Sequence, residues 1–125
     1  GDLMVPLSSV PEMIRRIKEI SAEWNIEIGI ISHIGDGNIH PIPLKPADMT
    51  PEHWARYAEE FFTALIREAI SLGGVGSGEH GVGHVKQKVL MDSKSPAEIE
   101  LLQGIKRAFD PYNIMNPGKM FSPLD

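Results

Sequence analysis

The sequence predicts an α+β fold, in which an antiparallel sheet carries helices on one face and a helical segment follows toward the C-terminal end. Two amphipathic stretches with helix-start signals flank β-branched stretches that resemble a hairpin. A run with six glycines in eleven residues, 73–83, interrupts this pattern, and one further stretch with helix signals follows it.

The first half of the chain supplies the predicted sheet. Residues 3–5 favour a short strand. Residues 8–24 open with serines and a proline and then repeat apolar side chains at helical spacing, which predicts a serine-capped helix. Residues 25–32 and 38–44 are rich in β-branched residues and flank Asp36-Gly37, so they predict a hairpin.

The second half is dominated by helices. Thr50 and Pro51 have the residue types of an N-cap and a first helical position, and Gly73 follows the end of the predicted helix. Ser95 and Pro96 repeat this start signal, and Asp110-Pro111 ends the next helix. We divide the chain into a part with sheet and helices, 1–72, and a part with the glycine-rich loop and the helical segment, 73–125.

Composition excludes several classes of function. The 125 residues carry a formal net charge of −5, which gives no basic surface for binding nucleic acid. The chain has no cysteine, so an iron–sulfur cluster with cysteine ligands would have to belong to a partner subunit. We find no secretory signal and no apolar run that would span a bilayer, and we expect a cytoplasmic protein. The first residue is not methionine, which suggests a fragment.

The stretch SHIGDGNIHP places two of the five histidines on either side of a turn signal. If Asp36 and Gly37 form a two-residue turn, His33 faces His40 across the hairpin. Opposed Cβ atoms lie about 4.5–5.5 Å apart, close enough for both imidazoles to bind one metal ion. The same pair would equally suit two solvent-exposed histidines without a ligand. Asp36 and Asn38 are interpreted as turn-forming residues.

The glycine-rich loop contains Glu79 and His80 as its only ionisable residues. Glycines allow close approach to a bound group, so both side chains could be presented to a ligand. His33, His40 and Glu79 would leave open positions on Zn²⁺, Mn²⁺ or Fe²⁺, and His80 would be free to act as a base. A flexible connector with a solvated Glu-His pair remains the alternative. The match to G-x-G-x-x-G at 76–81 does not indicate a dinucleotide site, because it follows a helix rather than a strand.

Three stretches, taken together, are specific enough to indicate a protein family: HIGDGNIHP, GGVGSGEHGVGHVKQKVL and IKRAFDPYNIMNPGKMF. In this order they resemble the C-terminal domain of the FAD-linked oxidases in the vanillyl-alcohol oxidase superfamily, particularly the glycolate oxidase and D-lactate dehydrogenase group. The resemblance covers the whole chain but only the last part of such an enzyme. It implies a ferredoxin-like portion of the family's cap domain, and FAD bound mainly by a domain that is absent from this chain.

The resemblance also implies a function. The chain would belong to a flavin-dependent D-2-hydroxy acid dehydrogenase, with His33, His40 and Glu79 as metal ligands and His80 as the base that assists hydride transfer from substrate C2 to flavin. Asn116, in the NPGK segment, would lie near the flavin. Ile42 stands where the hydroxyglutarate enzymes have an asparagine, which argues against a dicarboxylate substrate.

The expected partners are a small 2-hydroxy acid, the FAD-binding domain and an iron–sulfur subunit. Apolar residues around the NPGK segment could cause the isolated chain to self-associate. The alternative function is a stand-alone metal-binding or interaction module of the same fold without redox activity.

Overall fold

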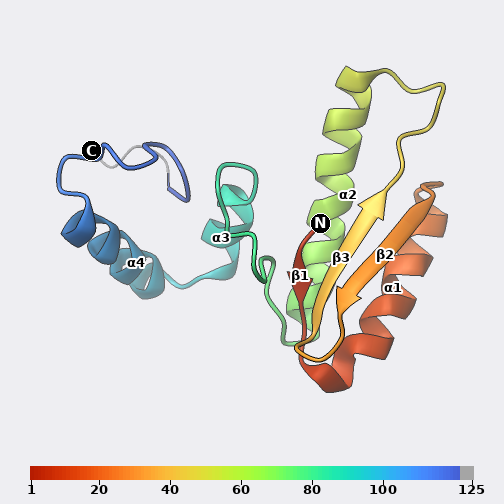
Figure 1. Cartoon of the computed structure of the whole chain (residues 1–125), viewed down its shortest axis with the longest axis horizontal. Helices are drawn as coiled ribbons and strands as arrows, with labels where there is room; N and C mark the ends of the chain where they lie inside the picture. The colour runs from red at the N-terminus through yellow and green to blue at the C-terminus, as the bar shows by residue number, and fades with distance from the viewer. Residues whose placement is uncertain (122–125) are drawn as a thin grey trace. The chain divides into compact units, whose positions relative to one another are not determined.

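The computed structural model describes residues 1–121 and contains two compact units, Gly1–His80 and Gly81–Asp125 (Figure 1). The division that the sequence suggests after residue 72 stays a prediction. The predicted α+β class is confirmed, since a three-stranded antiparallel sheet occurs together with helices. Among the residues described, no helix is both long and apolar enough to cross a membrane.

The first unit contains the sheet and its two long helices. The strand order is β1-β3-β2, and both strand pairs are antiparallel. Pairing of the N-terminal strand with β3 is a feature that the local sequence pattern does not reveal. In chain order the elements are β1 (Leu3–Met4), the short 3₁₀ helix η1 (Leu7–Ser9), α1 (Val10–Glu23), β2 (Ile28–His33), β3 (Asn38–Pro43) and α2 (Pro51–Ser71).

The predicted start and end of α2 are confirmed. The Thr50 hydroxyl accepts a hydrogen bond from the His53 amide at 3.3 Å, and Pro51 is the first helical residue. Gly73 follows the helix with a φ of +80°, a conformation that glycine adopts without strain. The start of α1 differs from the expectation, because Ser9 occupies the N-cap position but its side chain makes no capping hydrogen bond.

Within the first unit, α1 and α2 lie on the same side of the sheet in Figure 1 and cover one of its faces. On β3, Ile39 and Pro41 point into the core and are fully buried, whereas His40 and Ile42 alternate with them toward the other face. The strands thus present an open face, which carries both histidines of the hairpin. The helices complete the core with Met13, Ile17, Phe61, Leu65 and Ala69.

The hairpin register differs from the prediction. His33 pairs with Asn38 and His40 pairs with Ile31, so the connecting loop has four residues, 34–37, instead of two. The hydrogen-bonded turn forms two residues earlier than predicted, with the Asp36 amide bonded to the His33 carbonyl at 3.2 Å. Gly37 is therefore free for another contact: its carbonyl accepts from the Val5 amide at 3.1 Å, and a Cβ there would lie 2.1 Å from the Val5 oxygen.

The error in register preserves the face on which the histidines lie. A shift of one residue would move a side chain to the other face of the sheet, but this shift is two residues. His33 and His40 are consequently diagonal neighbours on the open face rather than a directly opposed pair. Their ring centroids are 5.3 Å apart.

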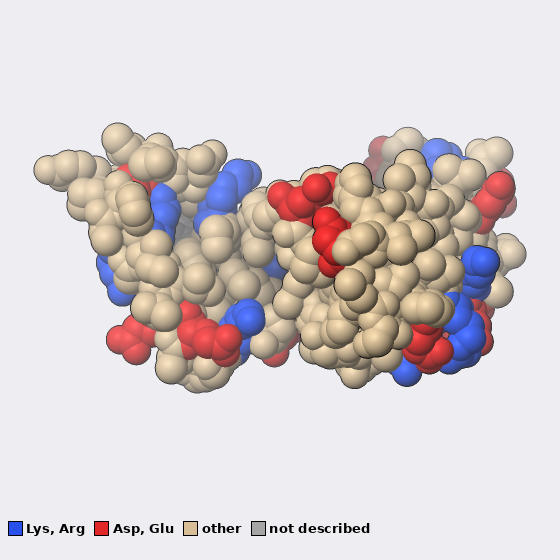
Figure 2. Space-filling model, turned by 60° about the horizontal axis from the view of Figure 1, so that its bottom comes forward, with Lys and Arg blue, Asp and Glu red and all other residues tan. Residues whose placement is uncertain are grey.

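The second unit contains α3 (Gln87–Ser93), which was not assigned from the sequence, and α4 (Pro96–Phe109). The start predicted for α4 is confirmed as a capping box: the Ser95 hydroxyl accepts from the Glu98 amide, and the Glu98 carboxylate accepts from the Ser95 amide. On the molecular face drawn in Figure 2, basic side chains lie in small groups among acidic ones and form no continuous basic area.

Candidate functional site

Four predicted site residues meet on the open face of the sheet. His33 and His40 project from β2 and β3, while Glu79 and His80 come from the loop after α2. The Glu79 Oε1 atom lies 3.5 Å from Nε2 of His33, 3.2 Å from Nε2 of His40 and 3.4 Å from Nε2 of His80. One carboxylate oxygen is therefore surrounded by three imidazole nitrogens.

His40 is the most firmly held member of this group. Its side chain is only 13% exposed, whereas His33, Glu79 and His80 are exposed. The Nδ1 atom of His40 lies 3.2 Å from the Gly1 carbonyl oxygen, a contact that fits a proton on Nδ1. Nε2, which faces Glu79, would then carry the free lone pair that a metal ion needs.

The distances suit a shared divalent ion. Two ligand atoms that bind one tetrahedral ion with bonds of about 2.1 Å lie roughly 3.4 Å apart, which is close to the separations between Glu79 Oε1 and the histidine nitrogens. Within residues 1–121, His33, His40 and Glu79 form one set whose ligand atoms all lie within 4.8 Å, and Asp2, His40 and His80 form another. The donor chemistry of both sets fits Zn²⁺, Mn²⁺ or Fe²⁺.

The loop that carries Glu79 and His80 is held by Asp2. This carboxylate is 2% exposed and accepts hydrogen bonds from the Ser77 hydroxyl and from three successive backbone amides, those of residues 78–80. The sequence analysis did not single out Asp2. No local signal could have identified it, because its partners lie more than seventy positions away in the sequence.

Asn38 does not have the turn-forming role that the sequence suggested. It is the first residue of β3, pairs with His33 and is 2% exposed. Its Oδ1 atom is buried and has no hydrogen-bond partner among the residues described, which costs about 1–3 kcal/mol unless a bound molecule donates to it. Gly78 packs against it so closely that a Cβ would lie 2.8 Å from Oδ1. Asp36, in contrast, does form the turn, accepting from the Asn38 amide at 3.1 Å.

Asn116, the residue predicted to approach the flavin, lies in the second unit. It is exposed, has a φ of +50°, and lines a largely apolar pocket of about 590 Å³ with Ile105, Met115 and Phe121. Its role toward the flavin stays a prediction.

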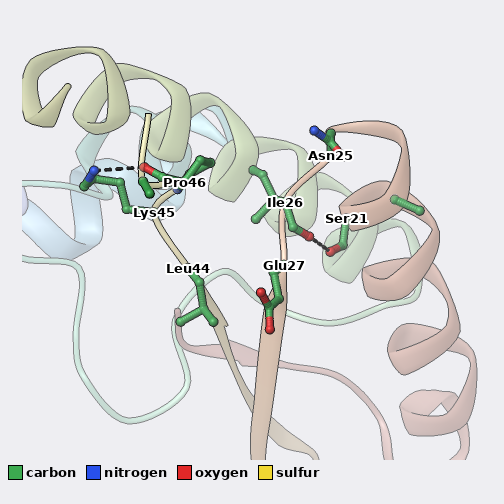
Figure 3. Close-up of a pocket in the computed structure, with 9 residues that line it drawn as sticks. Ser21, Asn25, Ile26, Glu27, Leu44, Lys45 and Pro46 are labelled. Carbon is green, nitrogen blue, oxygen red and sulfur yellow. Dashed lines mark hydrogen bonds between the residues drawn. The ribbon is translucent and has the colours of Figure 1, made fainter. Parts of the chain in front are cut away.

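A further pocket, of about 510 Å³, lies in the first unit at the open end of the hairpin (Figure 3). Glu27 and Leu44 flank it, the Ser21 hydroxyl donates to the Ile26 carbonyl, and Lys45 donates to the Pro46 carbonyl. This pocket is at the opposite end of the strands from the hairpin loop beside the histidines.

The two remaining histidines lie outside the cluster. His53 is exposed on α2, and His84 is exposed in the turn before α3. The Tyr57 and Phe61 rings of α2 pack against Trp24, with centroids 5.2 and 5.8 Å away.

Comparison with known proteins gives the family. The model of the family described as "FAD linked oxidases, C-terminal domain" matches residues 1–120. The chain belongs to this family of FAD-linked oxidases. The resemblance inferred from HIGDGNIHP, the glycine-rich loop and the NPGK segment is therefore confirmed.

Several curated relatives of this FAD-linked oxidase domain are similar along nearly its whole length. A D-lactate dehydrogenase of Archaeoglobus fulgidus is 43% identical over 98% of this chain and 26% of its own length. The glycolate oxidase subunit GlcD of Bacillus subtilis is 39% identical over 97% of this chain and 25% of its own length. A D-2-hydroxyglutarate dehydrogenase of Stutzerimonas stutzeri is 38% identical over 98% of this chain and 27% of its own length. The FAD-linked oxidase domain thus spans about a quarter of these relatives.

Proposed function

We propose that this chain supplies the divalent-metal site and the general base of a flavin-dependent D-2-hydroxy acid dehydrogenase. The observation that carries the proposal is the convergence of three imidazole nitrogens on one Glu79 oxygen, on the sheet face that the helices leave open. The curated relatives are named as D-lactate, glycolate and D-2-hydroxyglutarate enzymes, which supports this reaction class.

In this proposal His33, His40 and Glu79 hold the metal ion. A divalent ion held there would supply the Lewis acid that lowers the pKa of a coordinated substrate hydroxyl, and a bound flavin would supply the acceptor for the hydride from C2. His80 takes the hydroxyl proton on Nε2, which already points toward the same carboxylate as His40.

We further propose a small monocarboxylic substrate, such as glycolate or D-lactate. Ile31 lies directly opposite His40, and Ile42 lies two residues after His40 on the same face of the sheet. The side chains of Ile31 and Ile42 are both exposed. A second substrate carboxylate on this surface would meet apolar groups that offer it no hydrogen bond. We therefore expect the whole protein to turn over D-lactate or glycolate faster than D-2-hydroxyglutarate.

The metal site is tested by titrating the chain with Mn²⁺ or Zn²⁺ in a calorimeter. We expect one ion per chain, and we expect replacement of both hairpin histidines, His33→Ala with His40→Ala, to remove most of the affinity because two of three ligands are lost. The matched control is His53→Ala with His84→Ala, which removes two exposed histidines outside the cluster. Equal affinity of the hairpin double variant and the control would contradict the assignment.

The alternative of a metal-binding or interaction module without redox activity predicts the same titration. Turnover of a 2-hydroxy acid by the whole protein, and not metal affinity, separates the two. An iron–sulfur subunit as electron acceptor, a cytoplasmic location and self-association of the isolated chain remain expectations of this proposal.

A further inference from the structure

We propose that Asp2 is a positioning residue of the site: its buried carboxylate holds the backbone of residues 77–80 so that Glu79 and His80 face the hairpin histidines. The consequence of this positioning is a preorganised metal site, and that consequence rests on the proposed function. The positioning itself can be observed without any metal.

The first argument is the pattern of donors around the carboxylate. Oδ2 accepts from the Ser77 hydroxyl at 3.0 Å, from the Gly78 amide at 3.0 Å and from the His80 amide at 3.1 Å. Oδ1 accepts from the Glu79 amide at 3.2 Å. Three successive amides can converge on one carboxylate only if the backbone curves around it, so Asp2 sets the path of the chain at both site residues.

The second argument is that this loop has little regular structure of its own. It contains no helix or strand, and its regular backbone link to the sheet is the bridge between Met4 and Val75, closed by hydrogen bonds of 3.1 and 2.8 Å. Asp2 lies two residues before Met4, next to this bridge. The same short N-terminal segment therefore anchors the loop twice, by backbone pairing and by the carboxylate.

The third argument separates positioning from metal binding. Asp2 shares a possible ligand set with His40 and His80, so it could in principle coordinate an ion directly. Each oxygen of an ionised carboxylate offers about two lone-pair directions, and Oδ2 already accepts from the Ser77 hydroxyl and from the amides of residues 78 and 80. A metal ion on Oδ2 would have to displace a donor of the loop. The carboxylate therefore acts on the site through Glu79 and His80.

The test uses the 125-residue chain with Asp2→Asn, which keeps the shape but replaces one acceptor oxygen by a donor that opposes the amides. Amide hydrogen exchange is measured without metal, and affinity for Mn²⁺ is measured by calorimetry. We expect exchange at residues 78–80 to be at least about tenfold faster and affinity to fall by roughly 10–100-fold, while exchange in α1 and α2 is unchanged. Asp48→Asn, the same change at an exposed position, is the control.

The outcomes are distinguishable. Unchanged exchange at residues 78–80 in Asp2→Asn would overturn the proposal, and so would loss of Mn²⁺ with unchanged exchange, which would make Asp2 a ligand. If the unsubstituted chain binds no metal but Asp2→Asn still exchanges faster at residues 78–80, the result would support the positioning role and refute the metal site. If Asp2→Asn does not fold, Ser77→Ala removes one donor only, and unchanged exchange in that variant would overturn the proposal.

Discussion

His80 has a proposed role that differs from that of its neighbours in the cluster, since it should move a proton without being needed to hold the metal. Its Nε2 lies 3.4 Å from the same Glu79 oxygen as the proposed ligands, so distance alone does not assign the role. The ring of His80 stacks on that of His40, with centroids 5.2 Å apart. A substitution that removes the base but preserves the ligands is therefore the informative one.

We expect His80→Asn, made in the whole flavoprotein, to lower the rate of substrate oxidation by roughly 10²–10⁴ while the metal content is unchanged. Steady-state kinetics with D-lactate and elemental analysis of the purified variant measure the two quantities. His84→Asn, a histidine outside the cluster, provides the control. Loss of the metal together with activity would show that His80 is a ligand and that another group is the base.

At the level of elements, the end of α4 depends on one buried carboxylate. Asp110 is 5% exposed, accepts from the Ile114 and Met115 amides at 2.9 Å each, and forms an ion pair with Lys106. The hydrogen bond from Lys106 is the main cause that lowers the pKa of Asp110 from its ordinary value of 3.8, with help from the two amides. These contacts join the helix to the segment that follows it.

This lowered pKa predicts how the second unit responds to acid. Because the folded-state pKa lies below the unfolded value, the stabilisation by Asp110 is present above about pH 3.8 and is lost as the pH falls through the folded pKa. We expect protection of the Ile114 and Met115 amides from hydrogen exchange to fall in that range, and Asp110→Asn to remove this pH-dependent component.

The control for the acid response is Asp92→Asn, which disrupts an exposed ion pair with Lys88 on α3. Exposed pairs contribute little to stability, so its exchange profile should follow that of the parent chain. An identical acid profile in Asp110→Asn and the parent chain would contradict the role assigned to Asp110.

At the level of the whole molecule, the chain is about a quarter of its curated relatives, and we expect it not to retain FAD when purified alone. Flavin binding needs a large cleft with positioned polar donors, and the glycine-rich loop is occupied by the Asp2 contact. When the chain is incubated with FAD and then purified, absorbance at roughly 450 nm, where oxidised flavin absorbs, should be absent. Stoichiometric FAD, or oxidation of D-lactate by this chain alone, would contradict the assignment of the cofactor to another domain.

The sequence by itself determined the strands, the three longer helices α1, α2 and α4, and the residue types of the site. Thr50 and Ser95 mark helix starts through hydrogen bonds made within a few residues, so the pattern is readable locally. The alternation of β3 fixed which side chains share a face, and for this reason His33 and His40 were placed on one face even though the register was wrong by two residues.

Only the tertiary structure decided the register, the partner of β1 and the position of the glycine-rich loop. The hairpin turn lies earlier than predicted and leaves the Gly37 carbonyl to accept from the Val5 amide, and the loop is fixed by the carboxylate of Asp2. Both contacts join residues distant in sequence, and no local propensity encodes them. Asn38 was misread for the same reason, since its burial against Gly78 depends on a loop forty positions later. Local patterns specify which groups can form a site, whereas long-range hydrogen bonds and packing decide where those groups meet.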